Sequence, residues 1–290
     1  MPAKSISSKT ILAITIAIIS WSSSFIFIRV SLQSYSPGEL ALFRYLIVSV
    51  VMLIFYFRLK VRHKPTLTEA LQLFFLGFFG IGIYMVTLNY GELTVSASIT
   101  SFIISMNPVV SILWAALFLS EKISFKRWIG IAISIIGVFI IAANELHHAT
   151  FNEGMLMLFI AVLCAGMYNV GQKPLLKKFH PIEVAAISAW SGTLVMLIFT
   201  PSLIHAIPHA TVYTTTSVIY LGVVPGAIGY LAWSVAMSSE TPISKTILTL
   251  YTLPLFSTLL GWMILGEMPA ISALIGGCIA LLGALVATRY

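Results

Sequence analysis

Apolar residues in this chain occur in long unbroken stretches, unlike the short alternating or amphipathic patterns of a water-soluble domain. About ten of these stretches reach the roughly 20 residues that a helix needs to cross about 30 Å of hydrocarbon. The links between them are short, and even the longest, 58–68 and 201–213, are too small to fold alone. We therefore predict ten membrane-spanning helices near residues 11–33, 37–57, 69–90, 95–119, 125–143, 153–172, 181–200, 214–236, 242–265 and 270–287.

The composition agrees with lipid as the main solvent. Of 290 residues, 59% are hydrophobic and 9% are charged, whereas an ordinary soluble domain carries about 25% charged residues. The first apolar stretch is too long for the apolar core of a signal peptide and has no small-residue cleavage site, so it predicts an uncleaved span. Cys164 and Cys278 lie inside apolar stretches, which indicates packing residues with no disulfide and no metal role.

The positive charges follow a one-sided pattern. With the N-terminus in the cytoplasm, the inner links hold nearly all Lys and Arg residues, whereas the outer links hold none. The net charge of +7 therefore reports topology, and we expect no nucleic-acid partner. This pattern predicts both termini inside, an even number of spans, and a multi-pass protein of the cytoplasmic (inner) membrane in contact with lipid. The outer links are 34–36, 91–94, 144–152, 201–211 and 266–269.

The chain repeats itself. The segment 80–137 recurs 146 residues later, as 226–283, without a gap, and the upstream part recurs at an offset of 144 residues. Tyrosine, proline, glutamate and glycine matches at one offset are more informative than apolar matches, because apolar chains match by chance. The matched pairs include Tyr84 with Tyr230, Pro108 with Pro254, Glu121 with Glu267, Gly130 with Gly276, Gly137 with Gly283, and Pro37 with Pro181.

The repeat divides the chain into two units of five spans, 1–145 and 146–290. An odd number of spans makes the second unit enter the membrane from the opposite side, so the halves are predicted to be inverted repeats. A site between such halves can open to either face as they exchange conformations, which is alternating access. The predicted fold class is an all-α integral membrane protein, with ten transmembrane helices as two inverted five-helix repeats around a central cavity.

Several motifs resemble the EamA branch of the drug/metabolite transporter superfamily. They are NPVVSILWAALFLSEKIS at 107–124, its echo LPLFSTLLGWMILGEMPA at 253–270, ISWSSSFIFIRV at 19–30 and GELALFRYLIVS at 38–49. The resemblance covers nearly the whole chain. It implies ten helices, a central cavity, and export or exchange of small polar metabolites. Amino acids are the common bacterial substrates of that family, which also includes carriers of nucleotide sugars and sugar phosphates.

Lys245 is the first candidate for substrate binding. It lies just inside the start of the ninth span, and Thr249 and Thr252 follow on the same helical face. Its counterpart in the other half is Ile99, so the charge exists once, as an asymmetric substrate requires. Its ammonium group would attract a carboxylate or phosphate; the alternative is that it extends toward the nearby membrane surface.

Arg44 is the second candidate. It lies seven residues past Pro37, and thus about 10 Å inside its helix. It either clamps helix-end carbonyls or faces a water-filled cavity. Arg29 and Lys173 lie near span ends and are predicted to extend toward the lipid headgroups.

Aromatic and polar residues within the spans are candidates for the cavity wall, because a buried Tyr or Trp needs a hydrogen-bond partner. Packing in the core is the alternative for each. Prolines within spans free backbone carbonyls, and with nearby glycine they are candidate hinges, or else packed kinks. The wall candidates are Trp21, Tyr84, Ser98, Tyr168, Asn169, Tyr230, Trp233 and Tyr251; the hinge candidates are Pro108, Pro225, Gly226 and Pro254.

Other classes of function are disfavoured. The glutamates lie at span ends, turns or loops, with Glu92 at the outer rim the nearest to an exception. We therefore predict no carboxylate deep in a span, and uniport or exchange without a central proton-relay glutamate. No metal site, cofactor or enzyme is expected, because the chain has no aspartate, no His–acid pair at motif spacing and no nucleophile elbow. A channel is a further alternative. The glycines of the fifth and tenth spans allow close helix contact within a monomer or between the chains of a homodimer.

Overall fold

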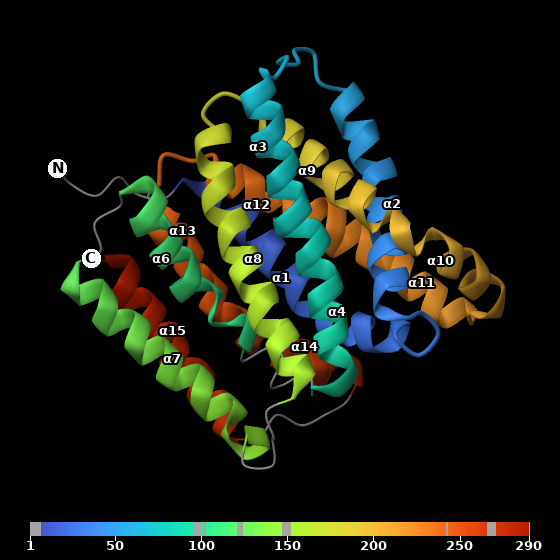
Figure 1. Cartoon of the computed structure of the whole chain (residues 1–290). Helices are drawn as coiled ribbons and strands as arrows, with labels where there is room; N and C mark the ends of the chain where they lie inside the picture. Colours follow the sequence, from blue (N-terminus) through green and yellow to red (C-terminus); the bar gives the residue numbers. More distant parts are fainter. Residues whose placement is uncertain are drawn as a thin grey trace.

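A computed structural model of the chain describes residues 7–95, 100, 103–120, 124–146, 152–241, 243–265 and 271–289. These residues form helices joined by short links, and this part of the chain contains no strand (Figure 1). The first half contains α1 (Ser8–Ser31), α2 (Pro37–Phe57), α3 (Leu67–Gly77), η1 (Phe78–Ile83), α4 (Tyr84–Thr94), α6 (Asn107–Leu119) and α7 (Phe125–Leu146).

The second half follows a similar order. It contains α8 (Glu153–Leu175), α9 (Pro181–Met196), η2 (Leu197–Phe199), α10 (Thr200–Ala206), η3 (Ile207–His209), α11 (Val212–Leu221), η4 (Gly222–Gly229), α12 (Tyr230–Met237), α13 (Ile243–Leu248), η5 (Thr249–Thr252), α14 (Leu253–Leu265) and α15 (Ile271–Arg289).

Six helical segments among the described residues are long and apolar enough to cross a membrane: 8–31, 37–57, 67–94, 153–175, 181–209 and 212–237. They coincide with six of the predicted spans and confirm an all-helical, multi-pass architecture. The total of ten spans and the inverted arrangement of the halves remain predictions, because parts of the other spans lie outside the described residues.

Helix starts are fixed by local chemistry. The backbone N–H of Ser36 donates to Glu39 Oε2 over 2.7 Å, and Pro37 occupies the first turn of α2. Thr66 and Glu69 form the same capping box at the start of α3. These arrangements satisfy backbone N–H groups that have no partner within the helix, which is why the predicted start of the second span is accurate.

The third and eighth spans are each interrupted by a π-helical segment, η1 and η4, whose last residues lie 146 positions apart. Both segments use glycine for close approach to a neighbouring helix. A Cβ on Gly80 would lie 2.5 Å from the Cβ of Tyr168, and one on Gly226 would lie 2.5 Å from Val48 Cγ2. The predicted hinge residues Pro225 and Gly226 both lie within η4, and their movement remains a prediction.

Helices α7 and α15 lie side by side at one edge of the bundle (Figure 1). A Cβ on Gly130 would overlap the backbone of Ala287, and one on Gly137 would overlap that of Ala280. The hydroxyl of Ser134 donates to the carbonyl of Ala280 over 3.1 Å. These small residues therefore serve a helix contact within one chain; the oligomeric state remains a prediction.

From its place near a span end, Lys173 was predicted to extend toward the lipid headgroups. The structure shows a different arrangement. Its Nζ donates to the carbonyl oxygens of Met237 (2.8 Å), Ser239 (2.7 Å) and Thr241 (3.2 Å). A lysine bound to the last carbonyls of a helix stabilises that end. Lys173 thus binds the last carbonyl of α12 and two carbonyls of the link that follows it, whereas Arg29, its counterpart in the first half, is exposed.

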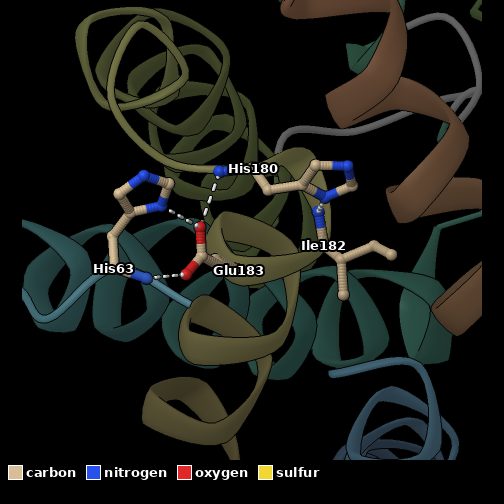
Figure 2. A network of polar contacts seen from close by, with 4 residues as sticks. All are labelled: His63, His180, Ile182 and Glu183. Atoms are coloured by element: carbon tan, nitrogen blue, oxygen red, sulfur yellow. Dashed lines mark hydrogen bonds and ion pairs between the residues drawn. The ribbon is translucent and has the colours of Figure 1, made fainter. Parts of the chain in front are cut away.

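A polar cluster ties the link before α3 to the start of α9 (Figure 2). The Glu183 carboxylate accepts bonds from the backbone N–H of His63 (2.7 Å) and of His180 (2.7 Å) and lies 3.1 Å from His63 Nδ1. The backbone N–H of Ile182 donates to His180 Nδ1 over 3.2 Å. Glu183 therefore has a structural role, because its oxygens are occupied by the chain itself.

Candidate functional site

A cavity of about 60 Å³ lies in the bundle between α1, α2, η1–α4, α6, α8 and the helices that follow η4. A water molecule needs roughly 10–15 Å³ on this scale, so the cavity holds several waters or part of a small metabolite. Residues from both halves of the chain line it: Trp21, Ser24, Phe25, Ile28, Arg44, Gly80, Tyr84, Met85, Leu88, Ile104, Asn107, Ala165, Tyr168, Asn169, Tyr230, Leu250 and Leu253.

Arg44 supplies the charge of this cavity. The residue is 2% exposed, and its guanidinium carbon lies 6.0 Å from the centre of the Tyr45 ring. Its Nε has no hydrogen-bond partner among the described residues. A Cβ on Gly226 would lie 3.7 Å from that Nε, so η4 packs closely beside the guanidinium. Of the two roles considered from the sequence, this geometry agrees with the cavity-facing one.

Three aromatic side chains from three helices form one wall of the cavity, and the ring of Trp233 packs against them from behind. The ring of Trp21 lies 5.3 Å from Tyr230 and 5.4 Å from Trp233, and the ring of Tyr168 lies 5.5 Å from Tyr230. The indole N–H of Trp21 donates to the carbonyl of Pro225 over 3.1 Å. The wall is therefore connected directly to the π-helical segment η4.

A hydrogen-bonded network holds the amide of Asn169 in place. Its Nδ2 donates to Asn107 Oδ1 (2.8 Å) and to Ser111 Oγ (3.1 Å), and its Oδ1 accepts the indole N–H of Trp233 (2.8 Å). The Ser111 hydroxyl also donates to Asn107 Oδ1 over 2.8 Å. Buried polar networks of this kind fix side-chain orientation when their members are satisfied. Trp233 does not line the cavity itself, but it positions Asn169, which does.

The cavity thus brings together six of the predicted substrate-binding residues from five elements. They are Trp21, Arg44, Tyr84, Tyr168, Asn169 and Tyr230.

Other predicted binding residues lie elsewhere. Lys245, on α13, is half-buried and does not line the cavity. The Thr249 hydroxyl donates to the carbonyl of Thr246, three residues earlier, over 2.7 Å, which is a local side-chain-to-backbone bond. Tyr251 is buried in a second cluster with Ile131 and other apolar residues. A substrate role for these three residues remains a prediction, and Ser98 lies outside the described residues.

Pro108 and Pro254 were predicted to kink continuous helices. Each instead lies at the second position of a new helical segment, α6 or α14. Proline is well tolerated in a first turn, where its missing N–H has no partner to lose. The spans are therefore interrupted just before these prolines, and a hinge role at these breaks remains a prediction.

Glu92 lies near the end of its span, as predicted, but it is buried, which its position at the rim did not predict. It is 4% exposed, and neither of its carboxylate oxygens has a hydrogen-bond partner in the described part of the chain. It follows Met85 and Leu88 on one face of α4, and both of these line the cavity. This helical spacing is the sequence signal that could have identified it, but a position near a span end made the residue look peripheral.

Comparison with known proteins is consistent with this architecture. The model of the EamA-like transporter family matches residues 8–143 and 152–289. A crystal structure has the same fold, with a TM-score of 0.77 at 18% identity over 98% of each chain.

Relatives in the sequence comparison carry transporter names. The "Uncharacterized transporter YdfC" of Bacillus subtilis is 35% identical over 91% of this chain and 85% of its own length. The "Probable terminal-alkyne amino-acid exporter" of Streptantibioticus cattleyicolor is 33% identical over 97% of this chain and 94% of its own length. The "Probable amino-acid metabolite efflux pump" of Escherichia coli is 24% identical over 77% and 76%. The chain belongs to the EamA-like transporter family.

Proposed function

We propose that this protein is a secondary transporter of small metabolites that carry a carboxylate, chiefly amino acids and related compounds. It works in the cytoplasmic membrane by alternating access and exports or exchanges its substrate. The observation that carries this proposal is the buried, cavity-lining guanidinium of Arg44 with an unpartnered Nε. An uncompensated buried charge is costly, and a substrate carboxylate removes that cost when it binds.

The chemistry of the wall supports an amino acid. A guanidinium binds a carboxylate through two parallel hydrogen bonds, and apolar or aromatic neighbours such as Phe25, Ile28 and Tyr230 accept an apolar side chain. Two relatives are named as an amino-acid exporter and an amino-acid metabolite efflux pump, which supports the same class for this chain.

The proposed mechanism uses the two halves, 1–145 and 146–290, as inverted repeats. Each π-helical segment contacts the other half: Gly80 of η1 packs on Tyr168, and a Cβ on Gly229 of η4 would lie 3.0 Å from the indole nitrogen of Trp21. Movement at either contact changes the wall of the cavity. Both termini are proposed to lie in the cytoplasm, and the protein to act as a monomer or homodimer.

A carrier of nucleotide sugars or sugar phosphates is the alternative. A phosphate group bound in the cavity would favour a second cationic side chain close to Arg44. Arg44 is the single Lys or Arg among the described residues that line the cavity. This favours a carboxylate over a phosphate. A channel or a membrane enzyme is more distant, because no observation favours either.

A thermal-shift screen tests the substrate class and its anchor together. The purified protein would be heated with amino acids, dipeptides, nucleotide sugars or sugar phosphates, alongside Arg44→Gln and Lys245→Gln. A ligand at 100 times its Kd stabilises the folded protein by about 2.7 kcal/mol. We expect amino acids to raise the Tm of the wild type and of Lys245→Gln, but not of Arg44→Gln. Stabilisation by sugar phosphates alone, or an equal shift in both variants, would contradict the proposal.

A further inference from the structure

Near the cavity lies a second buried ionisable group without a partner in the described part of the chain. Both carboxylate oxygens of Glu92 are buried and make no hydrogen bond within the described residues, as is also true of Arg44 Nε. A buried guanidinium and a buried carboxyl group with free bonding positions call for partners that the described chain itself does not supply.

The neighbours of Glu92 do not neutralise it by direct contact. On α1, Arg29 is exposed and acts on Glu92 only through its field. On α8, the carboxylate residue Glu153 is exposed. The packed surface there is apolar, because Gly91 lies against Leu158. On its own helix, Tyr84 lines the cavity two turns away.

The helix that carries Glu92 is fixed relative to the helix that carries Arg44. The side-chain amide of Asn89 donates to the carbonyl of Pro37, in the first turn of α2, over 3.0 Å. Glu92 lies one turn beyond Leu88 on the face of α4 that lines the cavity. A ligand bound at Arg44 and extending along this face toward the end of α4 therefore approaches the Glu92 carboxylate.

We propose that Glu92 binds the ammonium group of the substrate, so that the site selects zwitterions over carboxylic acids and over amines. The inference rests on the proposed function through Arg44, which binds the carboxylate of the same molecule. A zwitterion pairs both buried groups at once, its ammonium group with the Glu92 carboxylate and its carboxylate with Arg44. A carboxylic acid leaves Glu92 unpaired, and an amine leaves Arg44 unpaired.

The expected difference in affinity between an amino acid and the matching carboxylic acid follows from the cost of leaving Glu92 unpaired. Sites built to bond a polar group reject an analogue that lacks it by about 10⁴–10⁵-fold. We expect a carboxylic acid that lacks the ammonium group to bind at least about 100-fold more weakly than the amino acid. In Glu92→Gln the difference shrinks to less than about 10-fold, because the amide has no charge to leave unpaired.

Binding of two matched sets of compounds tests this. One set is L-phenylalanine, 3-phenylpropanoate and 2-phenylethylamine; the other is L-leucine, 4-methylpentanoate and 3-methylbutylamine. Dissociation constants would be measured by calorimetry on the full-length protein in detergent. The variants are Glu92→Gln, Glu92→Asp and Glu153→Gln. Glu153→Gln removes an exposed carboxylate on the adjacent helix and is expected to behave as the wild type, and Glu92→Asp to keep the preference for the amino acid.

The results separate this inference from the proposed function. Equal binding of the amino acid and its carboxylic acid to the wild type overturns the role of Glu92, whatever the variants show. If Arg44→Gln then loses both compounds, the proposed carboxylate site stands alone. An unchanged preference in Glu92→Gln also overturns the role of Glu92. If neither amino acid nor its carboxylic acid binds the wild type, both the inference and the proposed amino-acid class fail.

Discussion

At the residue scale, the choice between Arg44 and Lys245 shows what a sequence can and cannot predict. Counting residues places both within a span, but only packing decides which side of a helix meets the cavity. Arg44 lines the cavity and Lys245 does not. Glu92 was missed for the same reason, because the third residue from a helix end can still be enclosed by protein. The aromatic wall was largely predicted, since buried Tyr and Trp need polar neighbours.

Arg44→Lys separates charge from geometry at the proposed anchor. Lysine keeps the positive charge but lacks the planar pair of donors that matches a carboxylate. We expect the Kd for L-leucine to rise by about 10-fold, which corresponds to about 1.4 kcal/mol, whereas Arg44→Gln abolishes measurable binding. Calorimetry on the purified variants measures this. Wild-type affinity in Arg44→Gln would show that the carboxylate binds elsewhere.

At the element scale, long apolar stretches predicted the six long spans among the described residues, and capping boxes fix the starts of two of them. The interruptions were harder to predict, because glycine and proline permit a break without requiring one. The segments η1 and η4 are π-helical where glycines let a neighbouring helix come close. Pro108 and Pro254 begin new helical segments rather than bending old ones. π-helical turns occur often at functional sites, and η1 and α4 together line this cavity.

Two glycines in the same π-helical segment provide a matched test of this packing. A Cβ on Gly80 would lie 2.5 Å from the Cβ of Tyr168, whereas one on Gly82 would have its nearest contact at 3.4 Å. We expect Gly80→Ala to destabilise the protein by about 1–3 kcal/mol and to weaken substrate binding by displacing Tyr168. Gly82→Ala should unfold at the wild-type temperature or slightly above it. Thermal unfolding decides, and equal melting temperatures would argue against close packing at η1.

At the scale of the whole molecule, the sequence predicted a membrane transporter, and the family assignment agrees; the division into two related halves remains a prediction. Residues from both halves surround the cavity. The matched positions of η1 and η4 support the repeat. The identity of the substrate could not be predicted, because it depends on the distances between a few side chains, which no repeat or composition specifies.

Cysteine labelling tests the proposed orientation. In a variant with Cys164 and Cys278 replaced by serine, single cysteines would be placed at Lys64 and His205, in the links predicted to lie on opposite sides. A membrane-impermeant thiol reagent added outside cells should label His205→Cys and leave Lys64→Cys unmodified until the membrane is opened. Labelling of both positions from one side would contradict the predicted topology.

Counterflow in liposomes tests the central claim, that this protein carries carboxylate-bearing metabolites by alternating access through Arg44. Wild-type protein would be reconstituted with unlabelled L-leucine inside, and uptake of radiolabelled L-leucine would be followed with and without the internal substrate. We predict saturable uptake that internal leucine accelerates, retained in Lys245→Gln and lost in Arg44→Gln. Uptake that is linear in concentration and indifferent to internal leucine, or equal in Arg44→Gln and the wild type, would contradict the account.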